Sequence, residues 1–387
     1  MKVHELSFYS QFQCTMGNCP NTCCHGWQII LDDETVKKYM TRTDLHGFRL
    51  RSSLKRQNGA VMFKDSRGKC PFLTNERTCK IQLSLGEDNL PDVCRIFPRQ
   101  RTNYGLFAEE LLFLACPEAA RLFLNNLDHL YYKTIDREVS YAKSGTNDDP
   151  GYLQELLEIR SALTAQIMHS GLPRPLLYTG LLSYARALQQ SYISKDISYS
   201  KSIHISYERD SGCADGMRPD LAAHLKQAAT PFVIPHDITY AMLTSGFYHL
   251  FLKFTSPFLY DLCRTYLKKF HRLTPAKGDA RLHSLQEALH HDHPKAEHIL
   301  RGYLSYYLLE EFLFTYEDYS FLRSISTGIM HTHLLELFLA LHNEKNHRLT
   351  EDGIIQIITV YTRRGRHNDI IEKDMYEKLK LFLSHSR

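Results

Sequence analysis

Cysteine thiols are the side chains in this 387-residue sequence whose number and spacing point to chemistry. Eight of the ten cysteines precede residue 117, whereas an even spread would put about three there. The short spacings in Cys14-x4-Cys19-x3-Cys23-Cys24 let one turn present several sulfurs at a low loop-closure cost. Sulfur-rich ligation favours zinc or an iron–sulfur cluster over magnesium or calcium. The candidate metal ligands are Cys14, Cys19, Cys23, Cys24, Cys70, Cys79, Cys94 and Cys116, whereas the isolated Cys213 and Cys263 are expected to be ordinary thiols.

The cellular compartment decides whether clustered cysteines are metal ligands or disulfides. The N-terminal segment MKVHELSFYSQFQC has no basic start followed by a long apolar run, as a secretory signal would have. The sequence also lacks any stretch of about 18 uncharged apolar residues. We therefore expect a soluble, cytoplasmic protein with no membrane insertion. In that reducing compartment, clustered cysteines are metal ligands or redox thiols more often than disulfides.

The composition is that of a globular protein. Hydrophobic residues make up 43% and charged residues 23%, which excludes a mostly disordered chain. The 47 Lys and Arg residues against 43 Asp and Glu give a net charge of +4, so the sequence indicates no nucleic-acid partner. The length corresponds to two or three domain-sized units.

The residues around the first four cysteines limit which atoms can join a metal site. From residue 6 to residue 31 there is no Asp, Glu, Lys or Arg, so His25 is the only nitrogen candidate there. A zinc ion or a cubane cluster needs four ligands, so about half of the eight thiols can be structural. Adjacent Cys23 and Cys24 would point to opposite faces of an extended chain, and reach one metal only if the backbone bends. Packing of all eight as small apolar groups is the alternative, which their clustering disfavours.

The elements that must position these cysteines are short. The sequence predicts a helix over 32–40 that begins at Asp32 or Asp33, and a hairpin over 60–73 with its turn at 65–68. Residues 107–124 read as a helix that Pro117 kinks or restarts. Beyond the cysteines, three- and four-residue apolar spacing predicts helices over 152–169, 174–191, 239–274, 280–291, 295–317, 319–343, 350–364 and 368–384.

The expected fold is therefore mainly α. A Cys-rich metal-binding module with little regular structure, apart from a short hairpin, is expected to pack on a C-terminal multi-helix body. The expected domains are residues 1–130 and 131–387, with a linker near 142–151 and an irregular segment near 195–235.

At these residues the sequence resembles the flagellin lysine N-methylase (FliB) family, within the CxxCxxCC group of zinc- or iron-chelating proteins. The resemblance begins at FQCTMGNCPNTCCHGWQIILDDETVKKY and continues through CPFL (70–73), Cys79, CRIFPR (94–99) and CPEAAR (116–121). In the C-terminal half, HILRGYLSYYLLEEFLF resembles an aromatic helix of the family. The segment YTRRGRHN (361–368) resembles its Ser-Arg-x-x-Glu-His motif, with Thr362 in place of Ser and Arg366 in place of Glu before His367.

The resemblance implies a cytoplasmic protein-lysine N-methyltransferase that methylates lysine side chains of flagellin. It implies S-adenosyl-L-methionine as the methyl donor and a Cys-ligated iron–sulfur cluster, of 4Fe–4S type, with zinc as the alternative. No catalytic or donor-binding residue is assigned, and the sequence leaves open which four thiols ligate and whether there is one metal site or two. A non-enzymatic zinc- or iron-binding interaction module is the alternative function, and an electron-transfer or thiol-redox protein is a third.

Common methyltransferase signatures are absent from the sequence. No strand ending in a Gly-x-Gly loop and no alternating strand–helix pattern occurs, so a Rossmann-type donor site is not expected. A radical S-adenosylmethionine loop, Cys-x3-Cys-x2-Cys, fails because Gly26 occupies its third position.

Three further groups of residues have a functional and a structural interpretation. Lysine methylation requires deprotonation of an ammonium with a pKa of about 10.4, and aromatic walls would desolvate the amine and attract a cationic donor. The aromatic residues over 303–320 are candidates for such walls, although aromatic residues at helical spacing are usually core. The HHDHP segment at 290–294, with His298, is a metal patch or a solvated helix end. The last group is Arg363, Arg364 and His367. These residues would bind a carboxylate or act as acid–base groups, or, in the structural interpretation, they form a basic helix C-terminus.

Overall fold

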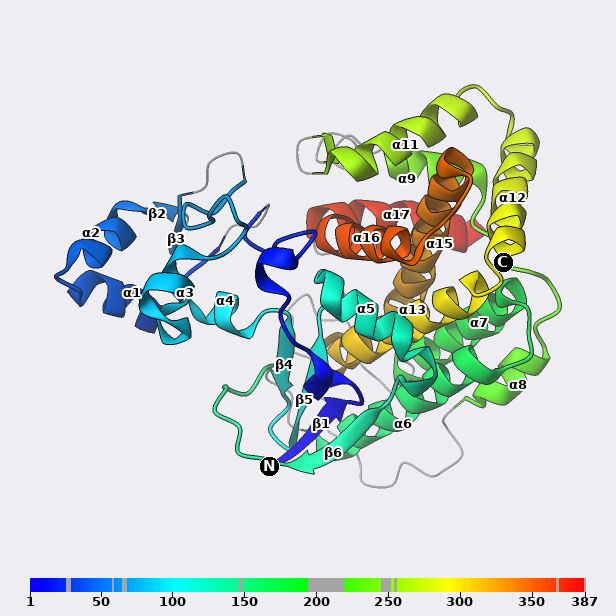
Figure 1. Cartoon of the computed structure of the whole chain (residues 1–387). Coiled ribbons are helices and arrows are strands. Elements are labelled where there is room, and N and C mark those ends of the chain that lie inside the picture. The colour runs from blue at the N-terminus through cyan, green and yellow to red at the C-terminus, as the bar shows by residue number, and fades with distance from the viewer. Residues whose placement is uncertain are drawn as a thin grey trace. The chain divides into compact units, whose positions relative to one another are not determined.

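A computed structural model describes residues 1–25, 29–57, 59–64, 68–145, 149–193, 219–244, 252–253, 256–366 and 369–385 (Figure 1). Contacts within the chain divide it into two units. The first unit contains Met1–Lys143, Leu250–Tyr260 and Thr350–His367, and the second contains Ser144–His249, Asp261–Leu349 and Asn368–Arg387. A C-terminal segment of the chain therefore belongs with the Cys-rich part. The domain boundary expected near residue 130 stays a prediction.

The first unit contains a four-stranded sheet with strand order β4-β5-β1-β6 (Figure 1). Its strands are β1 (Lys2–Leu6), β4 (Arg99–Asn103), β5 (Phe107–Leu112) and β6 (Tyr132–Asp136). β1 pairs in parallel with β5, and the pairs β4–β5 and β1–β6 are antiparallel. All six residues of β5 are buried, because this strand has a neighbour on each edge and a covered surface on each face.

The predicted helix over 107–124 is wrong in its first half, which is strand β5, and right in its second. The helix α5 (Pro117–Asn125) begins at the proline, whose missing N–H and fixed φ suit the first helical position. The sequence of β5, FAEELL, places apolar pairs four residues apart around Glu109 and Glu110, which is helical spacing and not the alternation of a half-buried strand. Glu110 is buried in this strand, where Arg137 pairs with its carboxylate and Arg101 approaches it to 3.6 Å.

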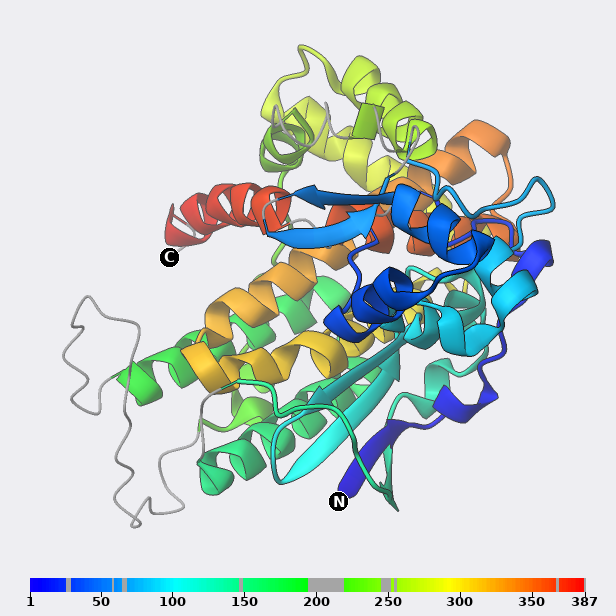
Figure 2. The ribbon, with the colours of Figure 1, turned by 90° about the vertical axis from the view of Figure 1, so that its left-hand side faces the viewer.

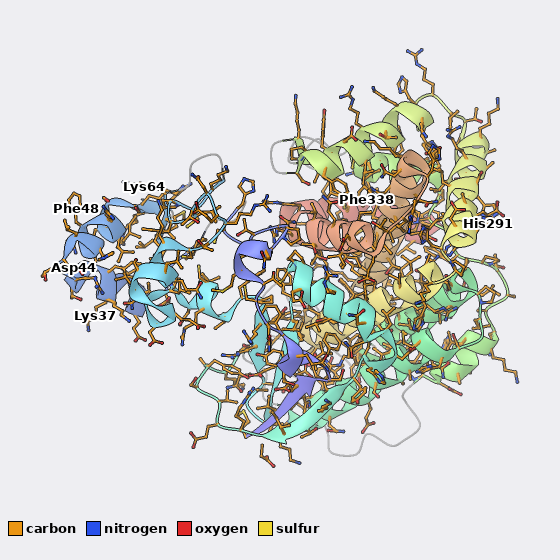
Figure 3. The ribbon with its side chains drawn as sticks, viewed as in Figure 1. Lys37, Asp44, Phe48, Lys64, His291 and Phe338 are labelled. Carbon is orange, nitrogen blue, oxygen red and sulfur yellow. The ribbon has the colours of Figure 1, made fainter. Side chains whose placement is uncertain are left out.

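The Cys-rich part of the first unit is built from short elements. They are α1 (Asp33–Thr41), α2 (Leu45–Ser52), β2 (Leu54–Gln57), β3 (Ala60–Phe63), α3 (Lys80–Leu85) and α4 (Asp92–Ile96). Asp32 caps α1, as predicted, by accepting a hydrogen bond of 2.8 Å from the N–H of Thr35. Figure 3 shows Lys37, Asp44 and Phe48 on α1, α2 and their connection.

A short hairpin is present, but its turn precedes Ala60 instead of following Phe63. Strands β2 and β3 are antiparallel, with Leu54 opposite Phe63 and Gln57 opposite Ala60 (Figure 2). Residues 65–67 of the predicted turn lie outside the described residues. The hairpin packs its apolar side into a small core of seven buried residues: Ile29, Leu31, Tyr39, Leu50, Phe63, Phe72 and Ile81.

The C-terminal segment of the first unit is an α-helix followed by a wider, π-helical turn. α16 (Glu351–Tyr361) begins at Thr350, whose side chain accepts a hydrogen bond of 3.2 Å from the N–H of Gly353. A π-helical turn, η6 (Thr362–Arg366), follows it. α16 packs on α5, and Nη1 of Arg121 in α5 lies 3.5 Å from Oε1 of Glu351.

The second unit is helical, as predicted. Its helices are α6 (Pro150–His169), α7 (Arg174–Ile193), α8 (Leu221–Lys226), α9 (His236–Thr244), α11 (Pro257–Phe270, from Asp261 onward), α12 (Pro275–Asp292), α13 (Ala296–Glu311), α14 (Thr315–Asp318), α15 (Phe321–Asn346) and α17 (Asp369–His385). The helix predicted over 239–274 corresponds to α9 and α11, and residues 245–251 between them lie outside the described part. Most of the segment near 195–235 also lies outside it. No helix in the described residues combines the length and apolar content that a membrane crossing needs.

The core of the second unit is centred on α15, which packs against α7, α12, α13 and α17. Phe338, labelled in Figure 3, is fully buried in this helix. Gly328 lets α15 approach α13 closely, since a Cβ there would lie 2.7 Å from Cδ1 of Tyr307. The helical spacing of apolar residues therefore predicted the elements of this unit correctly.

A buried charge network joins α7 and α15 within the second unit. The Glu336 carboxylate accepts hydrogen bonds from Arg174 at 2.9 Å and Gln286 at 3.0 Å, and lies 2.8 Å from Nε2 of His290. Arg174 also donates to Glu297 at 2.9 Å. Burial raises the pKa of Glu336, but the adjacent Arg174 outweighs it and holds that pKa below its usual range. The carboxylate is therefore charged and paired inside the helical core.

Replacement of Glu336 by Gln should destabilise the protein by about 3–5 kcal/mol, because it leaves the Arg174 guanidinium buried without its main counter-charge. Urea unfolding followed by circular dichroism measures the change. Glu351→Gln, at a mostly exposed carboxylate, is the matched control and should change stability by less than about 0.5 kcal/mol. Equal effects of the two substitutions would contradict the assignment of Glu336 as the main counter-charge of Arg174.

Stability should also depend on pH through His333 of α15, whose Nε2 lies 2.9 Å from the Thr239 hydroxyl. Burial lowers the pKa of His333 from 6.5 to about 4, so the unfolded chain takes up this proton first as the pH falls. The stabilisation is complete above pH 6.5 and declines between pH 6.5 and pH 4, by about 1–2 kcal/mol at pH 5. Urea unfolding at pH 7.5 and 5.0 measures the decline. In His333→Gln, the free energy of unfolding should decline less between pH 7.5 and pH 5.0 than in the wild type. An equal decline in the two proteins would refute the role of His333.

Candidate metal centre

All eight candidate ligands lie in the first unit and are free thiols. Cys14, Cys19, Cys23 and Cys24 lie in the loop that connects β1 to α1, and Cys94 lies within α4. Cys79 and Cys116 immediately precede helices α3 and α5. Thiols at helix N-termini meet backbone N–H groups and the positive end of the helix dipole, which favour the thiolate.

Three thiols have Cys24 as an electrostatic neighbour: Cys70, Cys79 and Cys94. The N–H of Cys70 donates to the carbonyl of Cys24 at 2.9 Å, which joins the first cysteine loop to the segment after the hairpin. A β-bridge between Leu73 and Cys79 closes the loop over residues 74–78, which separates Cys70 from Cys79. Cys70, Cys79 and Cys94 all pack on the small apolar core described above.

The pKa values of these thiols reflect that gathering. Burial raises the pKa of Cys70 to about 12 and also raises the pKa values of Cys79 and Cys94. The adjacent Cys24 adds to the rise in all three, as negatively charged neighbours do. The neighbouring Cys23 side chain lowers the pKa of the Cys24 thiol to about 7, against the effect of burial. Cys24 is therefore more readily ionised than Cys70, Cys79 or Cys94.

The backbone at Cys23 and Cys24 forms a turn, not an extended strand. The bend that one common metal would require at this pair is therefore present. The alternation expected of extended chain does not apply at this position.

A second group of thiols lies around Cys116. Burial raises the pKa of Cys116 to about 11, and nearby Cys19 and Cys14 add to the rise. The loop that carries these two is folded tightly, because the N–H of Met16 donates to the Cys14 sulfur at 3.4 Å and the N–H of Cys19 donates to the Met16 carbonyl at 3.0 Å.

Arg363 of η6 binds both of the segments that carry these cysteines. Its guanidinium donates to the carbonyls of Asn21 at 3.1 Å and Thr22 at 3.2 Å, and to Oδ1 of Asn21 at 3.1 Å. It also donates to the carbonyl of Ala115 at 2.8 Å. Each acceptor residue lies within two positions of a cysteine, so one buried side chain sets the first cysteine loop against Cys116.

From the sequence, Arg363 was a candidate for carboxylate or acid–base chemistry or for a basic helix end, whereas the structure shows it binding backbone carbonyls. Burial lowers the pKa of Arg363, whereas nearby Cys23, Cys116, Cys19 and Cys24 raise it. The cation therefore lies among four thiols. No sequence signal could identify this contact, because it joins residues more than 240 positions apart. His367, the third residue of that group, lies outside the described residues.

The thiols of the first unit are donors of the type that a zinc ion or an iron–sulfur cluster takes, but their side chains do not converge on one point. In the described residues, no three His, Cys, Asp or Glu side chains stand close enough together to hold an ion. Which of the eight thiols ligate stays a prediction. Cys263 is buried alone in α11, and Cys213 lies outside the described residues.

The two other candidate groups, both in the second unit, have structural roles. The aromatic residues over 303–320 are core, as the periodicity argument favoured: Tyr303, Tyr306, Tyr307, Phe312, Tyr316 and Tyr319 are buried, and Phe314 is half-exposed. The histidines of the HHDHP segment do not converge. His290 binds Glu336, His291 lies against Asp292, and His293 accepts a hydrogen bond from the N–H of Leu349.

Comparison with known proteins identifies the two parts of the chain. Residues 13–112 match the CxxCxxCC domain, to which zinc or iron chelation is attributed, and residues 181–382 match the FliB lysine N-methylase C-terminal domain. Cys116 lies just beyond the first match. No solved structure matches the chain.

Three Salmonella proteins are each 35% identical to this chain over 133 residues, a third of its length. They are the flagellar biosynthetic protein FliU of Salmonella muenchen and the lysine-N-methylases of Salmonella typhimurium and Salmonella choleraesuis. The aligned segment spans 79% of FliU and 33% of each lysine-N-methylase. Because the FliB C-terminal model covers more than half of the chain, this protein belongs to the FliB lysine N-methylase family.

Proposed function

We propose that the protein is an S-adenosyl-L-methionine-dependent protein-lysine N-methyltransferase that acts on flagellin and carries a Cys-ligated iron–sulfur cluster. The observation that carries the proposal is the match of residues 181–382 to the FliB lysine N-methylase C-terminal domain. The names of the Salmonella relatives support the lysine substrate and the flagellar association. The free thiols of the first unit support the metal centre.

The thiols that would hold the metal are drawn from the eight cysteines of the first unit. A bound zinc ion or iron–sulfur cluster would cross-link loops that are otherwise held by few regular elements, and its binding energy would add to the folding energy of that region. Arg363 has a definite task there. Four thiolates give a zinc or cubane site net negative charge, and a buried guanidinium compensates part of it without leaving a lone cation in the core.

Methyl transfer needs a neutral lysine amine aligned with the sulfonium methyl of the donor. A site on this protein must therefore remove the proton of an ammonium whose ordinary pKa is about 10.4, by desolvation or by a neighbouring base. The aromatic residues of α13 and α14 are core and do not themselves define such a site. The catalytic and donor-binding residues stay unassigned.

Incubation with flagellin and S-adenosyl-L-methionine should add about 14 Da per methyl group to flagellin lysines, as mass spectrometry of flagellin peptides would show. Flagellin incubated without the methyl donor is the control. A metal-loaded protein that adds no methyl group would favour the non-enzymatic interaction module.

The metal should be an iron–sulfur cluster. The anaerobically purified protein should be brown, absorb near 400 nm and contain acid-labile sulfide. Cys94→Ala should lose metal and stability, whereas Cys263→Ala should keep its metal content. A colourless protein with stoichiometric zinc would exclude the cluster.

Substitution of Arg363 tests its role as a positioning residue. Arg363→Gln leaves three backbone carbonyls without their donor and should destabilise the protein by about 2–4 kcal/mol while lowering bound metal at least about twofold. Arg363→Lys keeps the charge but cannot reach all three carbonyls, so it should restore part of the metal content. Arg121→Gln, at an exposed arginine of the same unit, should keep the wild-type metal content. Normal metal content and stability in Arg363→Gln would refute the role.

A further inference from the structure

Helix α2 of the Cys-rich region carries two large apolar side chains on its outer side. The exposed residues of this helix, which we call the α2 face, are Leu45, Phe48, Arg49 and Ser52. They follow one another at the three- and four-residue spacing that puts side chains on one face of a helix. Leu45 is 78% exposed and Phe48 is 66% exposed (Figure 3). Neighbouring apolar side chains on one exposed face are typical of an interaction surface, whereas scattered single ones are not.

The orientation of α2 is fixed, so the α2 face is held outward. The Arg51 guanidinium donates to the carbonyl of Tyr39 at 3.2 Å and to the carbonyl of Arg42, which joins α2 to the end of α1. Gly47 lies so near the chain before it that a Cβ there would be 2.3 Å from the Arg42 carbonyl oxygen. Leu50, on the inner side of α2, belongs to the small apolar core. A rotation that buried the α2 face would break these contacts.

The segment that contains the α2 face is strongly basic. Residues 37–56 contain seven Lys and Arg residues and one Asp, a net charge of +6, whereas the whole chain has +4. The one acid, Asp44, is paired with Arg42 at 2.8 Å. Lys38 and Arg51 donate to backbone carbonyls, which leave their charges uncompensated. The near-neutral composition of the chain therefore conceals a basic segment that includes an exposed apolar face.

These residue types favour a protein as the partner. Aromatic residues, Met and Arg are enriched in the centres of protein–protein interfaces. Phe48 and Arg49 lie on the α2 face, and Met40, 58% exposed, ends α1 five residues before Leu45. Nucleic acids are bound through polar contacts to phosphates and base edges, which Leu45 and Met40 do not supply. A helix that lies on a membrane separates its charged side from its apolar side, whereas Arg49 shares the apolar side of α2.

We propose that the α2 face is a docking surface for the protein substrate, which binds there through an acidic segment that carries an apolar side chain. That apolar side chain packs on Leu45 and Phe48, and the carboxylates pair with Arg49 and the basic residues around it. The choice of flagellin as the partner rests on the proposed function. The surface contributes affinity for the substrate and takes no part in the chemistry of methyl transfer.

Binding of flagellin to the full-length protein, measured by isothermal titration calorimetry without the methyl donor, tests the apolar part of the surface. Phe48→Ser should weaken binding at least about tenfold, as loss of an aromatic anchor in an interface does. Leu83→Ser is the matched control, because Leu83 of α3 is 67% exposed in the same region, and it should bind as the wild type does. Both variants should keep the wild-type circular dichroism spectrum, since neither side chain belongs to the core.

Reversal of a charge tests the basic part of the surface. Arg49→Glu should weaken flagellin binding at least about tenfold, because it places a like charge against the acidic segment. The wild-type affinity should also fall between about 50 and about 300 mM NaCl, since salt screens exposed charges. Arg348→Glu changes the net charge equally at an exposed arginine of the second unit and should keep the wild-type affinity.

Other results would overturn the proposal. A wild-type protein that does not bind flagellin, or wild-type affinity in both Phe48→Ser and Arg49→Glu, excludes the docking surface. Binding of phosphatidylglycerol vesicles or of DNA in place of flagellin, lost in both variants, would assign the α2 face to a membrane or a nucleic acid. Dimerisation that Phe48→Ser abolishes, without flagellin binding, would assign it to a second copy of the chain.

The test is separate from methyl transfer. Methyl transfer to flagellin by a protein whose two variants bind normally refutes the docking surface and leaves the methyltransferase proposal standing. Flagellin binding that both variants lose, in a protein that transfers no methyl group, refutes the proposed activity and leaves the docking surface standing.

Discussion

The buried guanidinium of Arg363 is the contact on which the arrangement of the first unit depends. It joins a loop near the N-terminus to the start of α5, and does so from a turn near the C-terminus of the chain. A planar group with five donors suits this task, because it can bind several carbonyls at once and remains charged at any physiological pH. The cost of burying that charge is offset where thiolates or a metal-bound sulfur set lie nearby.

The small core of the Cys-rich region explains why sulfur ligation matters there. Its elements are short helices and one two-stranded hairpin, and its apolar core has seven buried residues. Regions of this kind bury too little apolar surface to be stable without further cross-links, and a metal held by thiolates supplies them in a reducing compartment. Cys70, Cys79 and Cys94 lie against that core, so metal binding and packing would stabilise the same residues.

The second unit differs from the Cys-rich region in that it has a large apolar core of its own. Its long helices bury large aromatic and aliphatic side chains around α15, and its charges are paired inside the core. Arg174, Glu336 and Glu297 form a connected network, in which each buried charge has a hydrogen-bonded partner. The helical unit is therefore stabilised by its own packing, whereas the Cys-rich region relies on ligands and on Arg363.

The sequence alone determined the helices of the second unit and the set of candidate ligands. Apolar residues at three- and four-residue spacing specify a helix locally, and cysteines clustered at short spacings indicate a metal site before any fold is known. It did not determine strand β5, because the apolar residues of Phe107–Leu112 flank the adjacent Glu109 and Glu110, a spacing that suits a helix and lacks the alternation that marks a strand. Pairing of β1 with β5 joins residues about 100 positions apart, which local patterns do not encode.

Only the tertiary structure decided which cysteine-bearing segments meet and what Arg363 does. Asn21 and Thr22 are more than 90 positions from Ala115 in the sequence, whereas the guanidinium of Arg363 binds the carbonyls of all three. Hydrogen bonds between distant segments make that connection, and their partners are fixed by the path of the whole backbone. The residue types thus set the chemistry that is available, and the fold sets which atoms meet.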